Sequence, residues 1–178
     1  MSRDLTWSYN AGMAHTDAAL RDHVDSFLDR LHDIPGLDRE VEGIVDRIQA
    51  LQRRFRHALE QTLQEHDLTW GEWKALGSLV LGECDSPGLL ASELELSSGA
   101  MTNRLDRLEE AGLIRRVRHP TDRRAVKIEL TDAGHAAWTD STSAQARKEA
   151  LVAGALTRDE QAQLNALLRK LMLAFERD

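Results

Sequence analysis

The segment SSGAMTNRLDRLEEAGLIRRVR, residues 97–118, contains the change of pattern that decides the fold of this chain. Ser97 is a candidate helix N-cap and Gly112 a candidate C-terminal stop, so a helix is expected between them. Directly after Gly112, residues 113–118 are typical of a β-strand. Three apolar residues recur in the helix at helical spacing and predict one buried face: Met101, Leu105 and Leu108.

Short elements flank this helix on both sides. Upstream, Thr69 and Glu72 form a capping-box pattern that starts a helix ending near Gly82, and a short helix is expected over about residues 88–94. Downstream, a turn precedes residues 125–130, which alternate apolar and polar side chains as a second strand does. Helix, short helix, helix and two-stranded hairpin is the order of a winged helix-turn-helix domain.

Longer helices are predicted outside this domain. Thr16 or Asp17 can cap a first helix, and a long amphipathic helix is expected over about residues 38–66. Two helices are expected after residue 131, the second behind a capping box at Thr157. The apolar stripes of the long and the last helix need partners beyond one small domain, which favours a dimer.

The predicted fold class is therefore mainly α with a small β-hairpin, a winged helix-turn-helix with N- and C-terminal dimerisation helices. The expected parts are a flexible arm over 1–16, N-terminal dimerisation helices over 17–66, the winged DNA-binding domain over 67–130, and C-terminal dimerisation helices over 131–178.

Composition excludes several classes of protein. Hydrophobic residues make up 42% and charged residues 30% of the 178 residues, a globular balance. No apolar run approaches the ~20 residues of a membrane span, and no secretory signal pattern opens the chain. A single cysteine, Cys84, excludes an internal disulfide and a multi-cysteine zinc site, and the seven histidines show no ligand spacing. We expect a cytoplasmic protein that is not an enzyme and has no metal or other cofactor.

Charge is unevenly distributed along the chain. The net charge is −7, but eight of the 23 Lys/Arg and only four of the 30 acidic residues lie between Ser97 and Lys127. That stretch carries +4 and the remainder −11, and a local basic stripe on an acidic body is typical of a site-specific DNA binder.

The outer face of the helix behind Ser97 suits the major groove of DNA. Hydroxyls and an amide can contact base edges, a glycine permits close approach, and arginines suit phosphate or guanine. The candidates are Ser97, Ser98, Gly99, Thr102, Asn103, Arg104 and Arg107.

The hairpin supplies a second set of DNA-binding candidates. Arg123 and Arg124 stand at the expected tip, where an arginine fits a narrow minor groove. Asp122 is close enough in sequence to orient a neighbouring arginine, and Lys127 adds a charge to the second strand.

These motifs together resemble the MarR family of bacterial transcriptional regulators. The resemblance rests on residues 97–109, 112–114, 122–124 and 130–134, and extends from about Val41 to Phe175. It implies a homodimer formed by the N- and C-terminal helices, palindromic double-stranded DNA as partner, and repression relieved by a small ligand. The extra N-terminal helix resembles a subgroup with urate-responsive members, but that subgroup has a tryptophan where this chain has Leu31, which counts against urate.

A ligand site is expected where the long helix meets the helix that begins behind Thr69. Flat apolar surface is available there, and nearby cations favour an anionic aromatic effector. The residues predicted to line the site are Arg47, Arg54, His57, Trp70 and Trp73, although the two tryptophans fit a structural core equally well.

Two alternative functions remain open from the sequence. A winged-helix domain can bind protein instead of DNA, which the acidic balance favours. Alternatively, oxidation of Cys84 could regulate the protein, but the residue falls in a predicted turn, where a structural or incidental thiol is the simpler interpretation.

Overall fold

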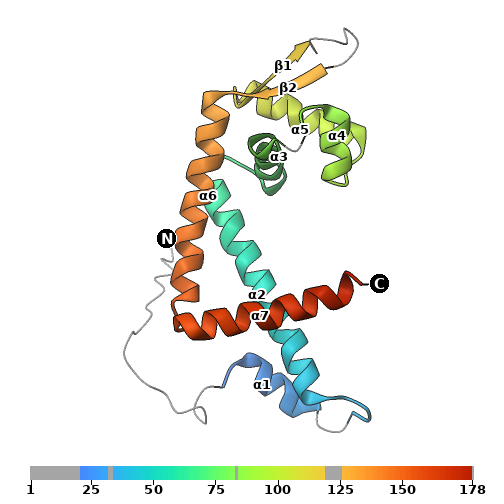
Figure 1. Cartoon of the computed structure of the whole chain (residues 1–178), viewed down its shortest axis with the longest axis vertical. Helices are drawn as coiled ribbons and strands as arrows, with labels where there is room; N and C mark the ends of the chain where they lie inside the picture. The colour runs from blue at the N-terminus through green and yellow to red at the C-terminus, as the bar shows by residue number, and fades with distance from the viewer. Residues whose placement is uncertain (1–20, 32–33, 83, 119–125, 178) are drawn as a thin grey trace. The chain divides into compact units, whose positions relative to one another are not determined.

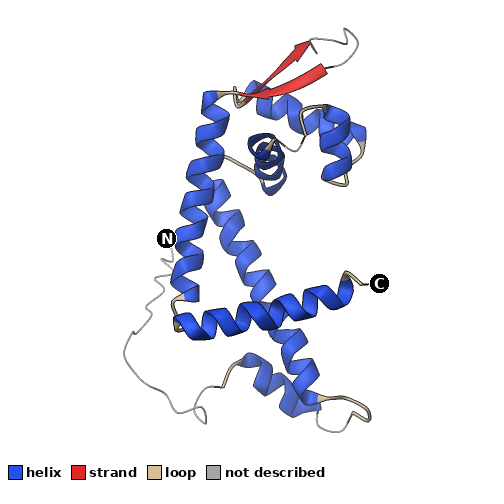
Figure 2. Ribbon diagram, viewed as in Figure 1, coloured by secondary structure: helices blue, strands red, loops and turns tan. Residues whose placement is uncertain are grey.

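A computed structural model of the chain describes residues 21–31, 34–82, 84–118 and 126–177. The chain forms two compact units, residues 1–53 and residues 54–178, which are described separately. Within the described residues, the elements are helices and a two-stranded hairpin (Figure 1, Figure 2). The order is α1 (His23–Leu28), η2 (Asp29–Leu31), α2 (Arg39–Gln64), α3 (Trp70–Leu81), α4 (Pro87–Glu93), α5 (Ser98–Glu110), β1 (Ile114–Arg118), β2 (Val126–Leu130), α6 (Asp132–Ala153) and α7 (Arg158–Phe175).

The first unit contains α1, η2 and the first part of α2. The predicted caps Thr16 and Asp17 lie outside the described residues; within them α1 begins at His23 behind a capping box of Asp22 and Asp25. Val24 and Leu28 are buried on the inner side of this short helix.

The winged helix-turn-helix predicted from the sequence is confirmed in the second unit. Thr69 caps α3 with Glu72 in a capping box, and Gly82 ends the helix with a φ of 71°, a conformation that favours glycine. Strands β1 and β2 pair antiparallel, from Ile114 opposite Leu130 to Arg118 opposite Val126. The amide of Ile128 also donates to the Asp85 carbonyl at 2.7 Å, which ties β2 to the segment before α4.

One apolar core holds these elements together. Its members come from the end of α2, α3, α4, α5 and both strands, so the orientation of α5 is set by packing on every neighbouring element. The fully buried large side chains are Leu63, Leu76, Leu90, Met101, Leu105, Leu108, Ile114 and Ile128.

Helix α6 joins this core to α7. The buried hydroxyl of Thr62, near the end of α2, donates to Oε1 of Gln145 on α6 at 3.0 Å. Thr157 and Glu160 form the capping box predicted for α7, whose apolar residues are exposed. No helix in the described part of the chain is long and apolar enough to cross a bilayer.

Candidate nucleic-acid interface

Helix α5 presents one apolar and one polar face, as its sequence predicts. Met101, Leu105 and Leu108 are buried against the core. The exposed residues of the first turns are Ser97, Ser98, Gly99, Ala100, Thr102 and Asn103. The polar face is therefore available to a partner over the N-terminal half of the helix, which is the half that enters a groove in helix-turn-helix proteins.

Local hydrogen bonds already use two of the hydroxyls on this face. The Ser97 side chain accepts from the Ala100 amide at 3.3 Å as the N-cap, and the Thr102 hydroxyl donates to the Ser98 carbonyl at 2.9 Å. In the described part of the chain, the Ser98 hydroxyl and the Asn103 amide group have no hydrogen-bond partner. Asn103 therefore offers both a donor and an acceptor to solvent.

The two arginines of α5 are turned towards the start of α3. The guanidinium of Arg104 lies over Gly71, where an added Cβ would overlap it, and its Nε is buried without a hydrogen-bond partner among the described residues. Nη2 of Arg107 lies 3.1 Å from Oε1 of Glu72. Both arginines are candidate DNA contacts by sequence; as DNA contacts they stay predictions.

Glu72 contacts both Thr69, at the start of its own helix, and Arg107 of α5. Its carboxylate is buried and accepts hydrogen bonds from the Thr69 amide at 2.8 Å and the Thr69 hydroxyl at 2.6 Å. The capping box that starts α3 thus also binds Arg107 of α5. The sequence predicts the capping box, but it contains no signal for the contact between the helices.

A second cluster joins the wing, which is the hairpin of β1 and β2, to α5. Nη1 of Arg116 lies 2.6 Å from Glu109, and its Nη2 lies 2.7 Å from Asp106. The Arg116 amide also donates to Glu109 at 2.9 Å. This amide and then the guanidinium hold the pKa of the Glu109 carboxyl below its ordinary value. Sequence reasoning missed this cluster because the contact is formed across the Gly112 turn, outside helical spacing.

Of the remaining wing candidates, the structure describes Lys127 alone. Lys127 is half-buried on β2, with Nζ 3.7 Å from Glu129, and Glu129 also pairs with Arg115 at 2.8 Å. Asp122, Arg123 and Arg124 lie outside the described residues.

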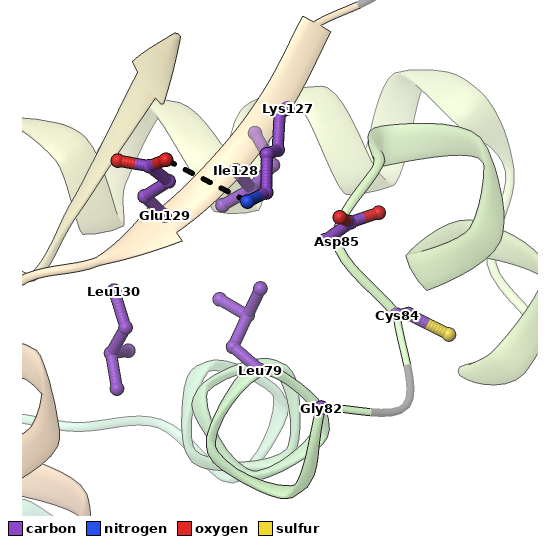
Figure 3. A pocket seen from close by; sticks show the side chains of 8 residues that line it. All are labelled: Leu79, Gly82, Cys84, Asp85, Lys127, Ile128, Glu129 and Leu130. Atoms are coloured by element: carbon purple, nitrogen blue, oxygen red, sulfur yellow. Dashed lines mark ion pairs between the residues drawn. The ribbon is translucent and has the colours of Figure 1, made fainter. Parts of the chain in front are cut away.

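A shallow open pocket lies between β2 and the end of α3 (Figure 3). Leu79, Gly82 and Leu130 line it together with polar residues of β2, and the partly exposed Cys84 and Asp85 form another part of its wall. No group of three or more His, Cys, Asp or Glu side chains suited to a metal ion occurs in the part of the chain that the structure describes.

The predicted ligand-site tryptophans belong to an aromatic cluster. The ring centres of Trp70 and Trp73 are 5.5 Å apart, and those of Trp73 and Trp138 are 6.5 Å apart. Nε1 of Trp73 donates to the Thr142 hydroxyl at 3.1 Å, while the guanidinium carbon of Arg56 lies 4.0 Å from the Trp70 ring centre. Arg56 and Trp138 are not among the residues predicted for the site, since the polar face of α2 and the weakly amphipathic α6 contain no signal for them.

Two of the cations predicted for the site, His57 and Arg47, are paired with other side chains. Arg54 and His57 are exposed, and His57 is hydrogen-bonded to Gln61 at 3.1 Å. In the first unit, Arg47 pairs with Asp22 at 3.0 Å and with Asp25 at 2.6 Å. The Asp22 amide and then Arg47 lower the pKa of Asp25. A role of Arg47, Arg54 or His57 in ligand binding stays a prediction.

Comparison with known proteins finds similarity to bacterial transcriptional regulators. Residues 68–126 match the MarR family. The transcriptional regulator PecS of Dickeya dadantii is 29% identical over 137 residues, covering 75% of this chain and 82% of PecS. The multiple antibiotic resistance protein MarR of Escherichia coli is 34% identical over 116 residues, covering 64% of this chain and 80% of MarR. The crystal structure of YusO from Bacillus subtilis covers 78% of this chain and 99% of its own, with a TM-score of 0.70 and 25% identity.

Proposed function

Because this chain belongs to the MarR family of transcriptional regulators, we propose that it is a dimeric repressor that binds a palindromic operator and is released by a small anionic aromatic ligand. The observation that carries the proposal is the exposed polar face of α5 beside a β-hairpin wing. A helix of this kind enters the major groove, and the wing contacts the adjacent backbone or minor groove.

Base reading is assigned to the outer face of α5 and phosphate or minor-groove contact to the wing. Ser98, Gly99, Thr102 and Asn103 face outward, and Ser97 fixes the start of the helix. The wing contributes Arg123, Arg124 and Lys127, with Asp122 orienting the arginines. These cations attract DNA of any sequence, and the contacts to particular base edges form afterwards.

The test is a mobility shift with the intergenic DNA upstream of the chain's own gene. We expect a sequence-dependent complex at moderate salt that unlabelled intergenic DNA displaces and random DNA does not. Binding that is weak and equal for all sequences would instead favour the alternative, a winged-helix module that binds protein.

Dimerisation is proposed from the apolar side chains that a single chain leaves exposed. On α2 these include Ile44, Ile48 and Leu51, each at least 41% exposed, and on α7 they include Leu167 at 61% and Phe175 at 81%. Exposed apolar stripes of this size mark a protein interface. A two-fold dimer would set its recognition helices ~34 Å apart, one turn of DNA. A folded monomer in sedimentation at micromolar concentration would contradict the dimer.

The ligand is proposed to bind at the aromatic cluster. Trp70 and Trp73 offer stacked apolar surface, and Arg56 over Trp70 adds a cation to the predicted Arg54 and His57. A ligand can release DNA only by its differential affinity for two arrangements of the protein.

A thermal-shift screen of aromatic carboxylates and phenols, followed by a DNA-release assay, tests this site. We expect Trp73→Phe and Arg56→Gln to weaken binding of an active compound at least several-fold. Glu60→Gln, an exposed change on the same helix, is the control. A compound that releases DNA and binds the unchanged protein and all three variants equally would place the ligand site elsewhere.

A further inference from the structure

We infer that α5 reads A·T base pairs through Asn103, and that Arg104 and Arg107 are positioning residues that hold this helix against α3 and do not read guanine. The inference rests on the proposed DNA-binding function and specifies the base pairs that the helix recognises. The side chains of α5 differ in whether contacts within the protein already hold them.

Arg104 is held at the start of α3 by shape. Its guanidinium fits over Gly71 because that residue has no Cβ, and its Nε is buried. A side chain that reaches a base edge in the groove must extend away from the protein, whereas this one is folded onto the neighbouring helix. If the Arg104 side chain moved away from Gly71, both its aliphatic stem and its guanidinium would lose their packing.

Arg107 is held by charge. Its partner Glu72 is only 7% exposed, and a buried carboxylate that is deprived of its cation keeps its desolvation cost without the compensating attraction. Both Thr69 donors bond to Oε2 of Glu72, so its Oε1 would lose the cation that it now faces. A move of Arg107 to guanine therefore breaks an ion pair that the free protein already has.

Asn103, unlike these two arginines, is available for contact with DNA. It is exposed on the outer face, and in the described part of the chain no group pairs with its amide. An asparagine can donate to N7 and accept from N6 of adenine at the same time, a pairing that guanine does not permit. The preceding residue, Thr102, has its hydroxyl proton committed to Ser98, so its methyl group remains for contact with the thymine methyl.

The first experiment identifies the base that α5 reads. A pool of randomised palindromic duplexes is selected with the full-length protein, and the winning site is resynthesised with single 7-deazaadenine or 7-deazaguanine substitutions, which remove the N7 acceptor. One 7-deazaadenine per half-site should weaken binding about 10-fold for each half-site, since a good bidentate pair discriminates by ~1–3 kcal/mol. Asn103→Ala should reduce affinity by a similar factor and become insensitive to that substitution.

The second experiment separates positioning from DNA contact. Gly71→Ala forces the Arg104 guanidinium away without changing charge, and Gly88→Ala, at the equivalent helical position of α4 with open space around it, is the control. We expect Gly71→Ala and Arg104→Gln to weaken specific binding while the slope of log affinity against log salt stays unchanged. Removal of one phosphate contact would instead reduce that slope by about 0.9.

Four outcomes of these experiments test the inference. A 7-deazaguanine penalty that disappears in Arg104→Gln or Arg107→Gln would overturn the inference, and so would a shallower salt slope in these variants. If the selection enriches no duplex at all, the proposed DNA-binding function itself fails. Enrichment of a site with the adenine and salt behaviour described above supports both.

Discussion

At the scale of single residues, Glu109 shows how one carboxylate fixes the wing. Its oxygens accept from the amide and the guanidinium of Arg116, and Arg116 in turn pairs with Asp106. The pKa of Glu109 is lowered because the folded protein favours the charged form, first through the Arg116 amide. The stability that ionised Glu109 contributes is therefore fully present above the pKa of this group in the unfolded chain, ordinarily about 4.5. It is lost as the pH falls through the lower pKa of the folded protein.

Glu109→Gln should consequently destabilise the protein at pH 7 and have little effect once Glu109 itself is protonated. The loss of stability should stay below about 1 kcal/mol because the group is partly exposed, so the Tm should fall by about 1–3 °C. Thermal unfolding of both proteins from pH 7 to pH 3 measures the difference, with the exposed Glu110→Gln as control. A difference that grows towards low pH would contradict the assigned contact.

The two wing arginines give a second prediction at this scale. Arg123→Ala and Arg124→Ala remove cations that we propose contact the DNA backbone or minor groove. Each should weaken operator binding and reduce the salt slope by about 0.9 for every phosphate that the variant no longer neutralises, in contrast to Arg104→Gln. Fluorescence anisotropy of labelled operator over a range of salt concentrations measures both. An unchanged slope in both variants would remove the wing from the phosphate contacts.

At the scale of elements, the start of α6 fixes the base of the hairpin. The Thr131 amide donates to the Leu113 carbonyl at 3.1 Å, and the Thr131 hydroxyl donates to the Gly112 carbonyl at 2.8 Å. The same hydroxyl accepts from the Gly134 amide at 3.0 Å as the helix cap. Gly134 is therefore pressed against the backbone between α5 and β1, and any Cβ there would overlap the Leu113 carbonyl oxygen.

Gly134→Ala should destabilise the winged domain, although alanine favours a helix elsewhere. A backbone carbonyl cannot move aside as a flexible side chain can, so we expect the free energy of unfolding to fall by ~1–3 kcal/mol, typical of an overpacked site. Chemical denaturation measures this change, and Gly88→Ala, which meets open space, should leave stability nearly unchanged. Equal stability of Gly134→Ala and the unchanged protein would show that α6 and the hairpin can separate freely.

Sequence patterns predicted the elements better than their contacts. The capping boxes at Thr69 and Thr157 and the buried face of α5 follow from spacing alone, because they depend on neighbours within the same helix. The direction of Arg104 depends on the missing Cβ of Gly71 in another helix, and no spacing rule contains that information. The same holds for Trp138, which reaches the aromatic cluster from a helix whose sequence is only weakly amphipathic.

At the scale of the whole molecule, charge and apolar surface have separate roles. The residues between Ser97 and Lys127 carry a net charge of +4, whereas the chain as a whole carries −7. DNA is therefore attracted to one part of the protein and repelled by the rest, which favours a single docking orientation. The exposed leucines of α7 lie outside that basic stretch, and we propose that they serve association between copies.

If α7 supplies part of the dimer interface, one charge placed in its apolar stripe should separate the subunits and weaken DNA binding without touching the winged domain. Leu168→Glu is the variant, because Leu168 lies within the exposed stripe at 38% exposure. Ala166→Glu adds the same charge about 200° around the helix and is the matched control.

Linked binding of two half-sites gains a factor of about 10²–10⁴ over binding of one half-site. Leu168→Glu should therefore sediment as a monomer and forfeit most of that factor on the full palindrome, while its affinity for an isolated half-site is unchanged. Should Leu168→Glu remain a dimer with full operator affinity, the stripe on α7 would not be the interface, and dimerisation would have to be reassigned to α2 alone.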